Sequence, residues 1–157
     1  MSKINAILVV CMGNICRSPT MEAILKKRLA QAGLAVRVES AGTISYHQGN
    51  PPDPRSVAAG EARGYDFSAM QAQPVKPNDF TDFDLLLCAD KANYQDLMAQ
   101  CPQQYQHKIK LFLDYGEADQ TEVPDPYYGG EHGFEQVLDL IEAASDVIID
   151  KIRLSTR

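Results

Sequence analysis

Two reactive side chains lie close together near the N-terminus. Cys11 and Arg17 are separated by five residues in the stretch Cys-Met-Gly-Asn-Ile-Cys-Arg-Ser, which follows the apolar run of residues 4–10. A helical pattern begins near Ser18, so the stretch reads as a tight loop between a buried strand and a helix. Backbone N–H groups of such a loop and of the first helical turn can converge on one anion, and a guanidinium matches phosphate oxygens. The spacing therefore predicts a cradle for a tetrahedral oxyanion.

The same cradle is expected to activate Cys11. Positive backbone dipoles and Arg17 stabilise a thiolate over a thiol, and Ser18 could donate a hydrogen bond to the sulfur. Gly13 permits a left-handed backbone and Asn14 tolerates one, which favours an anion-binding nest. A thiolate that faces a bound phosphate is a nucleophile aimed at phosphorus. The alternative is a buried cysteine before a serine-capped helix; a nucleotide-binding loop is disfavoured, because Gly-x-x-x-x-Gly-Lys-Ser/Thr is absent.

A phosphate monoester also needs an acid beside its leaving oxygen. Asp125 lies between Pro124 and Pro126, which stiffen the backbone and fix where the carboxyl points. Tyr127 and Tyr128 follow, and paired phenol rings could form the wall of a slot for an aromatic group. The alternative is an ordinary turn with surface tyrosines. Together with the Cys-Arg loop, the stretch predicts a general acid next to an aryl ester.

Strand and helix patterns alternate along the chain. Strands are expected at residues 4–10, 34–42, 83–90 and 108–114, and helices at 18–33, 53–63, 90–98 and from Phe134 to the C-terminal tail. This alternation predicts a single α/β domain over residues 1–157, with a parallel sheet between helices. Ligands of such sheets bind at the carboxyl ends of the strands. The Cys-Arg loop occupies such a position.

Composition narrows the functional class. The 157 residues carry a net charge of −6, which argues against nucleic acid and requires any anion site to be built locally. No apolar run is long enough to span a bilayer and the N-terminus lacks a signal-peptide layout, so we expect a cytoplasmic protein without membrane association. The four cysteines and three histidines lack metal-ligand spacing, so no metal or other cofactor is expected. Cys88 is expected to be a small buried residue, and the sequence does not decide the role of Cys101.

Five motifs, in order, resemble the low-molecular-weight protein tyrosine phosphatases of the bacterial type. They are VCMGNICRSPT at residues 10–20, SAGT at 40–43, PPDPR at 51–55, DFTDFDLLLCAD at 79–90 and DPYYGG at 125–130. The resemblance covers nearly the whole chain. It implies a four-stranded parallel sheet in strand order 2-1-3-4, helices on both faces, and hydrolysis of phosphotyrosine and small aryl phosphates through a phosphocysteine intermediate without a metal.

The resemblance also assigns roles to residues. It implies that Cys11 is the nucleophile, Arg17 binds phosphate and Asp125 is the general acid. The implied substrate- and phosphate-binding positions are Met12, Gly13, Asn14, Ile15, Cys16, Ser18, Tyr46, Tyr127 and Tyr128. Ser40 is the implied partner of Asn14 in supporting the loop. Spacing leaves open whether Cys16 only fills space or forms a redox bond with Cys11, and the resemblance favours a protective disulfide.

The chain departs from the family pattern at two positions. Met70 and Gln73 stand where the family commonly has a histidine that braces the loop and, three residues on, an arginine. Arg63 and His47 are candidates to brace the loop instead.

The resemblance implies a tyrosine-phosphorylated protein as partner, with a tyrosine kinase or its target as candidates. We expect a monomer or weak self-association, which Tyr127 and Tyr128 could seed. Two rival functions remain: a thiol-dependent arsenate reductase, which needs a relay of further cysteines such as Cys88 and Cys101, and an inactive phosphate-binding module.

Overall fold

The computed structural model describes residues 3–126 and 130–155. In chain order, its elements are β1 (Ala6–Cys11), α1 (Arg17–Gln31), β2 (Arg37–Gly42), α2 (Pro54–Glu61), α3 (Asp79–Asp82), β3 (Leu85–Cys88), α4 (Lys91–Gln100), the 3₁₀ helix η1 (Gln103–Lys108), β4 (Ile109–Leu111), α5 (Phe112–Tyr115) and α6 (Gly130–Ser155). The strands form one parallel sheet in the order β2-β1-β3-β4. This confirms both the predicted fold class and the strand order that the resemblance implied.

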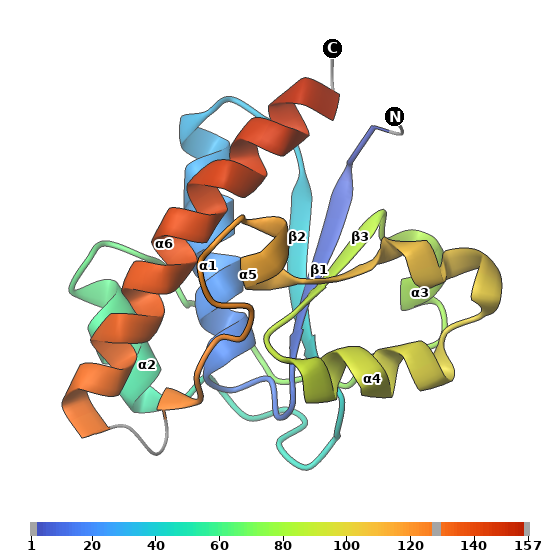
Figure 1. The fold of residues 1–157 in the computed structure, drawn as a ribbon. Helices are drawn as coiled ribbons and strands as arrows, with labels where there is room; N and C mark the ends of the chain where they lie inside the picture. The colour runs from blue at the N-terminus through green and yellow to red at the C-terminus, as the bar shows by residue number, and fades with distance from the viewer. Residues whose placement is uncertain (1–2, 127–129, 156–157) are drawn as a thin grey trace.

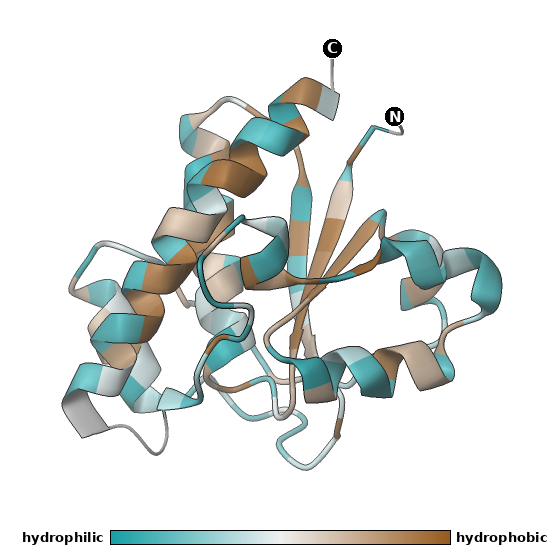
Figure 2. Cartoon of the chain, in the orientation of Figure 1, coloured by the Kyte–Doolittle hydropathy of each residue, from teal (hydrophilic) through white to brown (hydrophobic). Residues whose placement is uncertain are grey.

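Helices cover both faces of the sheet (Figure 1). Helices α1, α2, α5 and α6 lie on one side, and α3 and α4 on the other. The central strand β1 alternates between the two cores: Val9 and Cys11 pack with α1 and α6, while Leu8 and Val10 pack with residues of α3 and α4. Apolar residues concentrate on the strands, and the helices carry apolar and polar residues in alternation (Figure 2). A fully buried β1 thus delivers its last residue, Cys11, to the carboxyl edge of the sheet.

Helix ends follow the expected local signals. Asp53 caps α2 by accepting a hydrogen bond from the Arg55 N–H at 2.8 Å, and Pro54 opens the helix. Gly33 follows α1 with φ of +70°, a backbone conformation that glycine adopts without strain. Both signals are visible in the sequence, and the structure has helix ends at both places.

Some predicted bounds are wrong. The fourth strand was expected over residues 108–114, but β4 ends at Leu111 and a helical turn follows. In that turn Phe112 and Leu113 are both buried, which a strand facing one core could not achieve for consecutive residues. The last helix begins at Gly130 instead of Phe134. The first three strands are shorter than expected, and α3 and η1 were not expected at all.

Candidate functional site

The loop between β1 and α1 is held by backbone hydrogen bonds on several sides. Thr43 N donates to Cys11 O at 3.0 Å, and Ile44 N donates to Met12 O at 3.1 Å. Farther along the loop, the N–H of the α2 cap residue donates to Ile15 O at 2.7 Å. These bonds tie the loop to the segment that follows β2 and to the start of α2. A loop held in this way is organised before any ligand arrives.

Backbone conformation in the loop differs in part from expectation. Asn14 adopts the left-handed region, with φ of 59°. Gly13 does not, although the sequence suggested it. A Cβ on Gly13 would lie 2.9 Å from Cδ2 of His47, so this glycine makes room for the His47 ring. The left-handed turn of the nest therefore rests on Asn14.

The Cys11 sulfur lies at the centre of this loop. The residue is 3% exposed, and its Sγ accepts a hydrogen bond from the Asn14 N–H at 3.3 Å. Ser18 Oγ lies 3.1 Å from the same sulfur. Two groups that can donate to sulfur therefore lie beside Cys11.

The Asn14 side chain connects the loop to β2. Its Nδ2 donates to Ser18 Oγ at 2.7 Å and to Ser40 Oγ at 2.9 Å, and its Oδ1 accepts from the Gln73 N–H at 2.9 Å. Gln73 Nε2 also donates to Ser40 O at 2.9 Å. The expected pairing of Asn14 with Ser40 is therefore present, and Gln73 contacts both partners.

Of the two candidates for bracing the loop, Arg63 lies away from the loop and His47 lies against it. Arg63 pairs with three acidic residues of α6, Glu135, Asp139 and Glu142. His47 lines the pocket, where its ring packs against Gly13. Glu22 instead contacts Ser40, whose Oγ donates to Glu22 Oε1 at 2.6 Å. The sequence did not point to Glu22, because this contact joins α1 to β2 across the fold.

Arg17 opens α1 and is held by residues that follow β3 and α5 in the chain. Its Nη1 donates to Asp90 Oδ2 at 2.7 Å and to Val123 O at 3.1 Å. Burial acts to lower the pKa of Arg17, but the Cys11 sulfur and the Asp90 carboxylate outweigh it and the pKa lies above its usual value. Asp90 also caps α4 by accepting from Asn93 N at 2.8 Å. The sequence identified Asp90 only as a helix start; its place directly after a buried strand was the available signal.

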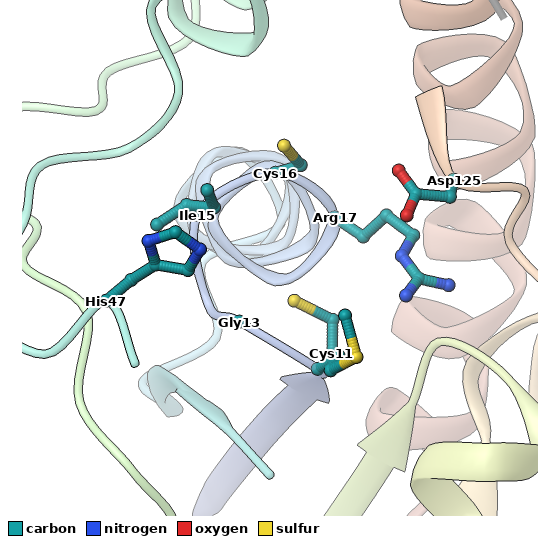
Figure 3. Close-up of a pocket in the computed structure, with 8 residues that line it drawn as sticks. Cys11, Gly13, Ile15, Cys16, Arg17, His47 and Asp125 are labelled. Carbon is teal, nitrogen blue, oxygen red and sulfur yellow. The ribbon is translucent and has the colours of Figure 1, made fainter. Parts of the chain in front are cut away.

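These groups open into one pocket of about 290 Å³, shown in Figure 3. Its lining residues are Cys11, Met12, Gly13, Ile15, Cys16, Arg17, His47 and Asp125. Asp125 and Arg17 lie on one side of the loop and His47 lies on the other (Figure 3). The sequence placed Cys11, Arg17 and Asp125 together in one site, and they do share this pocket. It did not assign His47 to the pocket.

The second loop cysteine has a different environment. The Cys16 sulfur points away from Cys11 in Figure 3. Burial, followed by the negative charge of Asp53, raises the pKa of the Cys16 thiol to about 12. Both cysteines are free thiols in this structure. Cys16 is therefore a protonated thiol at neutral pH.

The predicted aromatic rim is described only in part. Tyr46 is 83% exposed, and its ring lies edge-on to that of His47 at a centroid distance of 4.8 Å. Because His47 lines the pocket, Tyr46 lies next to a lining residue. Tyr127 and Tyr128 lie outside the described residues.

The remaining cysteines lie on the opposite core from Cys11. Cys88 and Cys101 both belong to the core packed by α3 and α4, whereas Cys11 belongs to the core packed by α1 and α6. Burial raises the pKa of the Cys88 thiol and of the Cys101 thiol. An arsenate reductase would need a relay of thiols that leads to Cys11. Cys88 and Cys101 do not provide one, because they lie in the other core.

The described residues hold neither a cluster of metal ligands nor a helix that could span a membrane. Within residues 3–126 and 130–155, no three histidine, cysteine, aspartate or glutamate side chains gather as a metal site would require. Over the same ranges, no helix combines the length and apolar character needed to cross a bilayer.

Comparison with known proteins identifies relatives of this architecture. Residues 6–156 match the family described as low molecular weight phosphotyrosine protein phosphatase. A Synechocystis protein named for this family is 49% identical over 142 residues, which are 88% of this chain and 90% of that protein.

Solved structures give the same result. A protein tyrosine phosphatase of Entamoeba histolytica superimposes with a TM-score of 0.92 at 42% identity, covering 98% of this chain and 99% of that one. The Vibrio vulnificus protein Wzb, solved in complex with benzylphosphonate, superimposes with a TM-score of 0.84 at 31% identity and covers 94% of this chain and 99% of its own.

Proposed function

The chain belongs to the low molecular weight phosphotyrosine protein phosphatase family, and we propose that it hydrolyses phosphotyrosine and small aryl phosphates through a phosphocysteine intermediate on Cys11. The observation that carries this proposal is the position of the Cys11 sulfur, between the Asn14 N–H at 3.3 Å and Ser18 Oγ at 3.1 Å, in a pocket that Arg17 and Asp125 also line.

The first step transfers the phosphoryl group to sulfur. The Cys11 thiolate attacks phosphorus, an S–P bond forms, and the bond from phosphorus to the phenolic oxygen breaks. The Arg17 guanidinium and the loop N–H groups stabilise the negative charge on the equatorial oxygens. Asp125 gives its proton to the departing phenolate, which leaves as a neutral phenol.

The second step regenerates the enzyme. Asp125, now ionised, accepts a proton from a water molecule that attacks the phosphocysteine. The S–P bond breaks, inorganic phosphate is released and Cys11 returns to the thiolate. Apart from the substrate and this water, both steps use only groups of the chain, and neither requires a metal.

Support for an aryl substrate comes from a relative and from the pocket. Wzb binds benzylphosphonate, in which an aromatic group is joined to a tetrahedral phosphorus acid. In this chain the pocket has Met12 and Ile15 among its lining residues, and an apolar wall suits an aromatic ring. We propose a tyrosine-phosphorylated protein as the physiological substrate, with a tyrosine kinase or its target as candidates.

The proposal is tested by substituting the nucleophile. Phosphate release from a phosphotyrosyl peptide and from an aryl phosphate is measured for the wild type and for Cys11→Ser. The wild type should turn over both substrates and Cys11→Ser neither, because this cradle does not ionise a serine hydroxyl. Cys11→Ser should still bind orthovanadate or phosphate weakly, since Arg17 and the loop N–H groups remain. Turnover by Cys11→Ser would remove Cys11 from this role, and an inactive wild type would leave only phosphate binding.

A further inference from the structure

Few large apolar side chains are exposed in the described part of the chain, and most of these lie in one place. They are Met12, Ile44, Tyr46 and Leu154. The first three come from two segments at the mouth of the Cys11 pocket, the β1–α1 loop and residues 43–47. A single exposed apolar residue is ordinary, but several at the mouth of a pocket indicate a surface that a ligand covers.

Backbone hydrogen bonds place Ile44 next to Met12. Beyond the paired strands, Thr43 N donates to Cys11 O at 3.0 Å. One residue on, Ile44 N donates to Met12 O at 3.1 Å, so the two segments run side by side. They are in close contact, because a Cβ on Gly42 would lie 2.7 Å from Met12 O and 3.1 Å from Ile44 O. Ile44 is therefore held at a fixed place relative to the loop that surrounds the Cys11 sulfur.

Met12 and Ile44 differ in their relation to the pocket. Met12 lines the pocket and is also 51% exposed. Ile44 is 42% exposed and is not among the residues that line the pocket. Met12 thus belongs both to the pocket wall and to the outer surface, and Ile44 lies beside it outside the pocket. We call Met12 and Ile44 together the apolar shelf.

A phosphotyrosine bound in this pocket would bring its neighbours in the substrate to the pocket mouth. The phosphoryl group must reach the buried Cys11 sulfur, so the ring occupies the pocket and the main chain stays outside. Consecutive Cα atoms are about 3.8 Å apart, so the residues on either side of the phosphotyrosine stay close to the mouth. Arg17 and Asp125 lie on one side of the loop, and His47, from the same segment as Ile44, lies on the other (Figure 3). The mouth therefore has a charged side and a side that offers apolar contact.

We propose that the apolar shelf binds a large apolar side chain directly next to the phosphotyrosine of the substrate, so that Ile44 is a specificity-determining residue. This role rests on the proposed function, because it takes a phosphotyrosine as the group in the pocket. The contact removes apolar surface of both partners from water, which stabilises the complex in proportion to the buried area. Since backbone hydrogen bonds already hold the segment of Ile44, binding costs little conformational freedom there.

The experiment compares three phosphotyrosyl peptides that are identical except at the two positions beside the phosphotyrosine. One has glutamine at both positions, one has leucine before the phosphotyrosine, and one has leucine after it. The wild type should hydrolyse at least one leucine peptide with a kcat/KM roughly threefold to tenfold above that of the glutamine peptide, as expected for partial burial of a leucine. Equal kcat/KM values for all three peptides would overturn the proposal.

Substitution of Ile44 shows whether the shelf causes this preference. Ile44→Ser should bring the ratio of leucine to glutamine kcat/KM close to one, and Ile44→Leu should keep it, because leucine retains the apolar area. The ratio compares peptides on one protein, so a general loss of activity or of folded protein cancels. The proposal fails if the ratio in Ile44→Ser equals that of the wild type.

Leu154 provides a matched control. It is 53% exposed and lies in the last turn of α6, roughly 36 Å along the helix from Gly130. Leu154→Ser removes an exposed apolar side chain away from the pocket and should keep the wild-type ratio. A ratio lowered as much as in Ile44→Ser would show that the preference does not depend on the shelf.

Binding measurements separate the shelf from the proposed reaction. Cys11→Ser keeps Arg17 and the loop N–H groups, so its affinities for the three peptides, measured by fluorescence anisotropy, give the same ratio without turnover. A wild type that hydrolyses no aryl phosphate would contradict the reaction, and these affinities would still decide on the shelf. A leucine preference that Ile44→Ser removes in the Cys11→Ser background supports the shelf, and equal affinities refute it. If analytical ultracentrifugation shows a dimer that Ile44→Ser dissociates, with no peptide preference, the shelf is a contact between copies of this chain and the proposal is wrong.

Discussion

At the scale of single residues, the proposed acid can be tested through the leaving group. Asp125 lines the Cys11 pocket beside Arg17, where it could protonate a departing phenolate. Asp125→Ala should lower kcat with a phosphotyrosyl peptide by roughly a hundredfold or more, the usual range for a general acid. The loss should be smaller with an activated aryl phosphate such as p-nitrophenyl phosphate, whose oxygen leaves without a proton. Equal losses on both substrates would make Asp125 a structural residue.

Redox behaviour is a second residue-scale prediction. Peroxide should oxidise the Cys11 thiolate to a sulfenic acid, and attack by the Cys16 sulfur would then form a disulfide and release water. Because the pKa of the Cys16 thiol is raised to about 12, this attack should accelerate as the pH rises toward that value. Both the wild type and Cys16→Ser are oxidised and then treated with thiol. The wild type should regain activity, and Cys16→Ser should accumulate the irreversible sulfinic acid.

Peptide mass spectrometry provides the check on this pairing. A Cys11–Cys16 cross-link is expected in the oxidised wild type before thiol is added. Equal recovery of the two proteins without that cross-link would leave Cys16 as a packing residue.

Contacts between residues of one loop were easier to predict from the sequence than contacts between segments that only the fold brings together. Cys11, Asn14 and Ser18 lie within one loop, so their proximity follows from the strand–loop–helix pattern. Glu22 and Asp90 could not be assigned in this way. Each meets its partner across the sheet edge, Glu22 from α1 to Ser40 and Asp90 from the end of β3 to Arg17. The only local signal for Asp90 was its place directly after a buried strand, and Glu22 had no comparable signal.

At the scale of elements, the predicted bounds were wrong where an apolar run is compatible with both strand and helix. The run from Ile109 to Leu113 fits a strand or a strand followed by a turn of helix. The helical turn is favoured here because it buries Phe112 and Leu113 together in the core against α6. The start of α6 was placed at Phe134, its first large apolar residue, although the helix begins one turn earlier at Gly130. The first turn of this helix precedes its first large apolar residue, so the spacing of apolar residues could not predict where the helix begins.

The contact between α5 and α6 gives a prediction about packing. Gly116 ends α5, and a Cβ there would lie 2.5 Å from the Ala144 Cβ and 2.8 Å from its backbone oxygen. Gly116→Ala must therefore push α6 away from α5, and we expect a loss of about 1–3 kcal/mol in the free energy of unfolding. Urea denaturation measures the loss. Activity at low temperature should change little, because Gly116 lies outside the pocket lining.

A matched substitution tests whether that loss comes from the α5–α6 contact. Ala144→Gly removes the nearest atom, so Gly116→Ala should cost less in the Ala144→Gly background than in the wild type. An unchanged urea midpoint in Gly116→Ala would mean that the two helices separate without cost.

At the scale of the whole molecule, a negatively charged protein has to bind an anion. The net charge of −6 repels a phosphate at long range, so affinity must come from the local donors of the β1–α1 loop and from Arg17. The parallel sheet makes this possible, because it brings the carboxyl ends of β1 and β3 to one edge, where Arg17 meets Asp90. Alternation of strands and helices was enough to predict a parallel sheet. The order β2-β1-β3-β4 came only from the resemblance, since the apolar pattern of a strand does not identify its neighbours.

A cradle made of backbone N–H groups and a guanidinium also predicts how the whole enzyme responds to chelators and to phosphate mimics. The proposed steps use only side chains and water, so extensive treatment with EDTA should leave kcat and KM unchanged. Orthovanadate should inhibit competitively against an aryl phosphate, because it can occupy the same loop as a phosphoryl group. Arg17→Lys should weaken that inhibition, since lysine lacks the planar pair of donors that matches two oxygens. Activity lost on chelation and restored by a divalent ion would contradict the reaction as proposed, whatever the behaviour of vanadate.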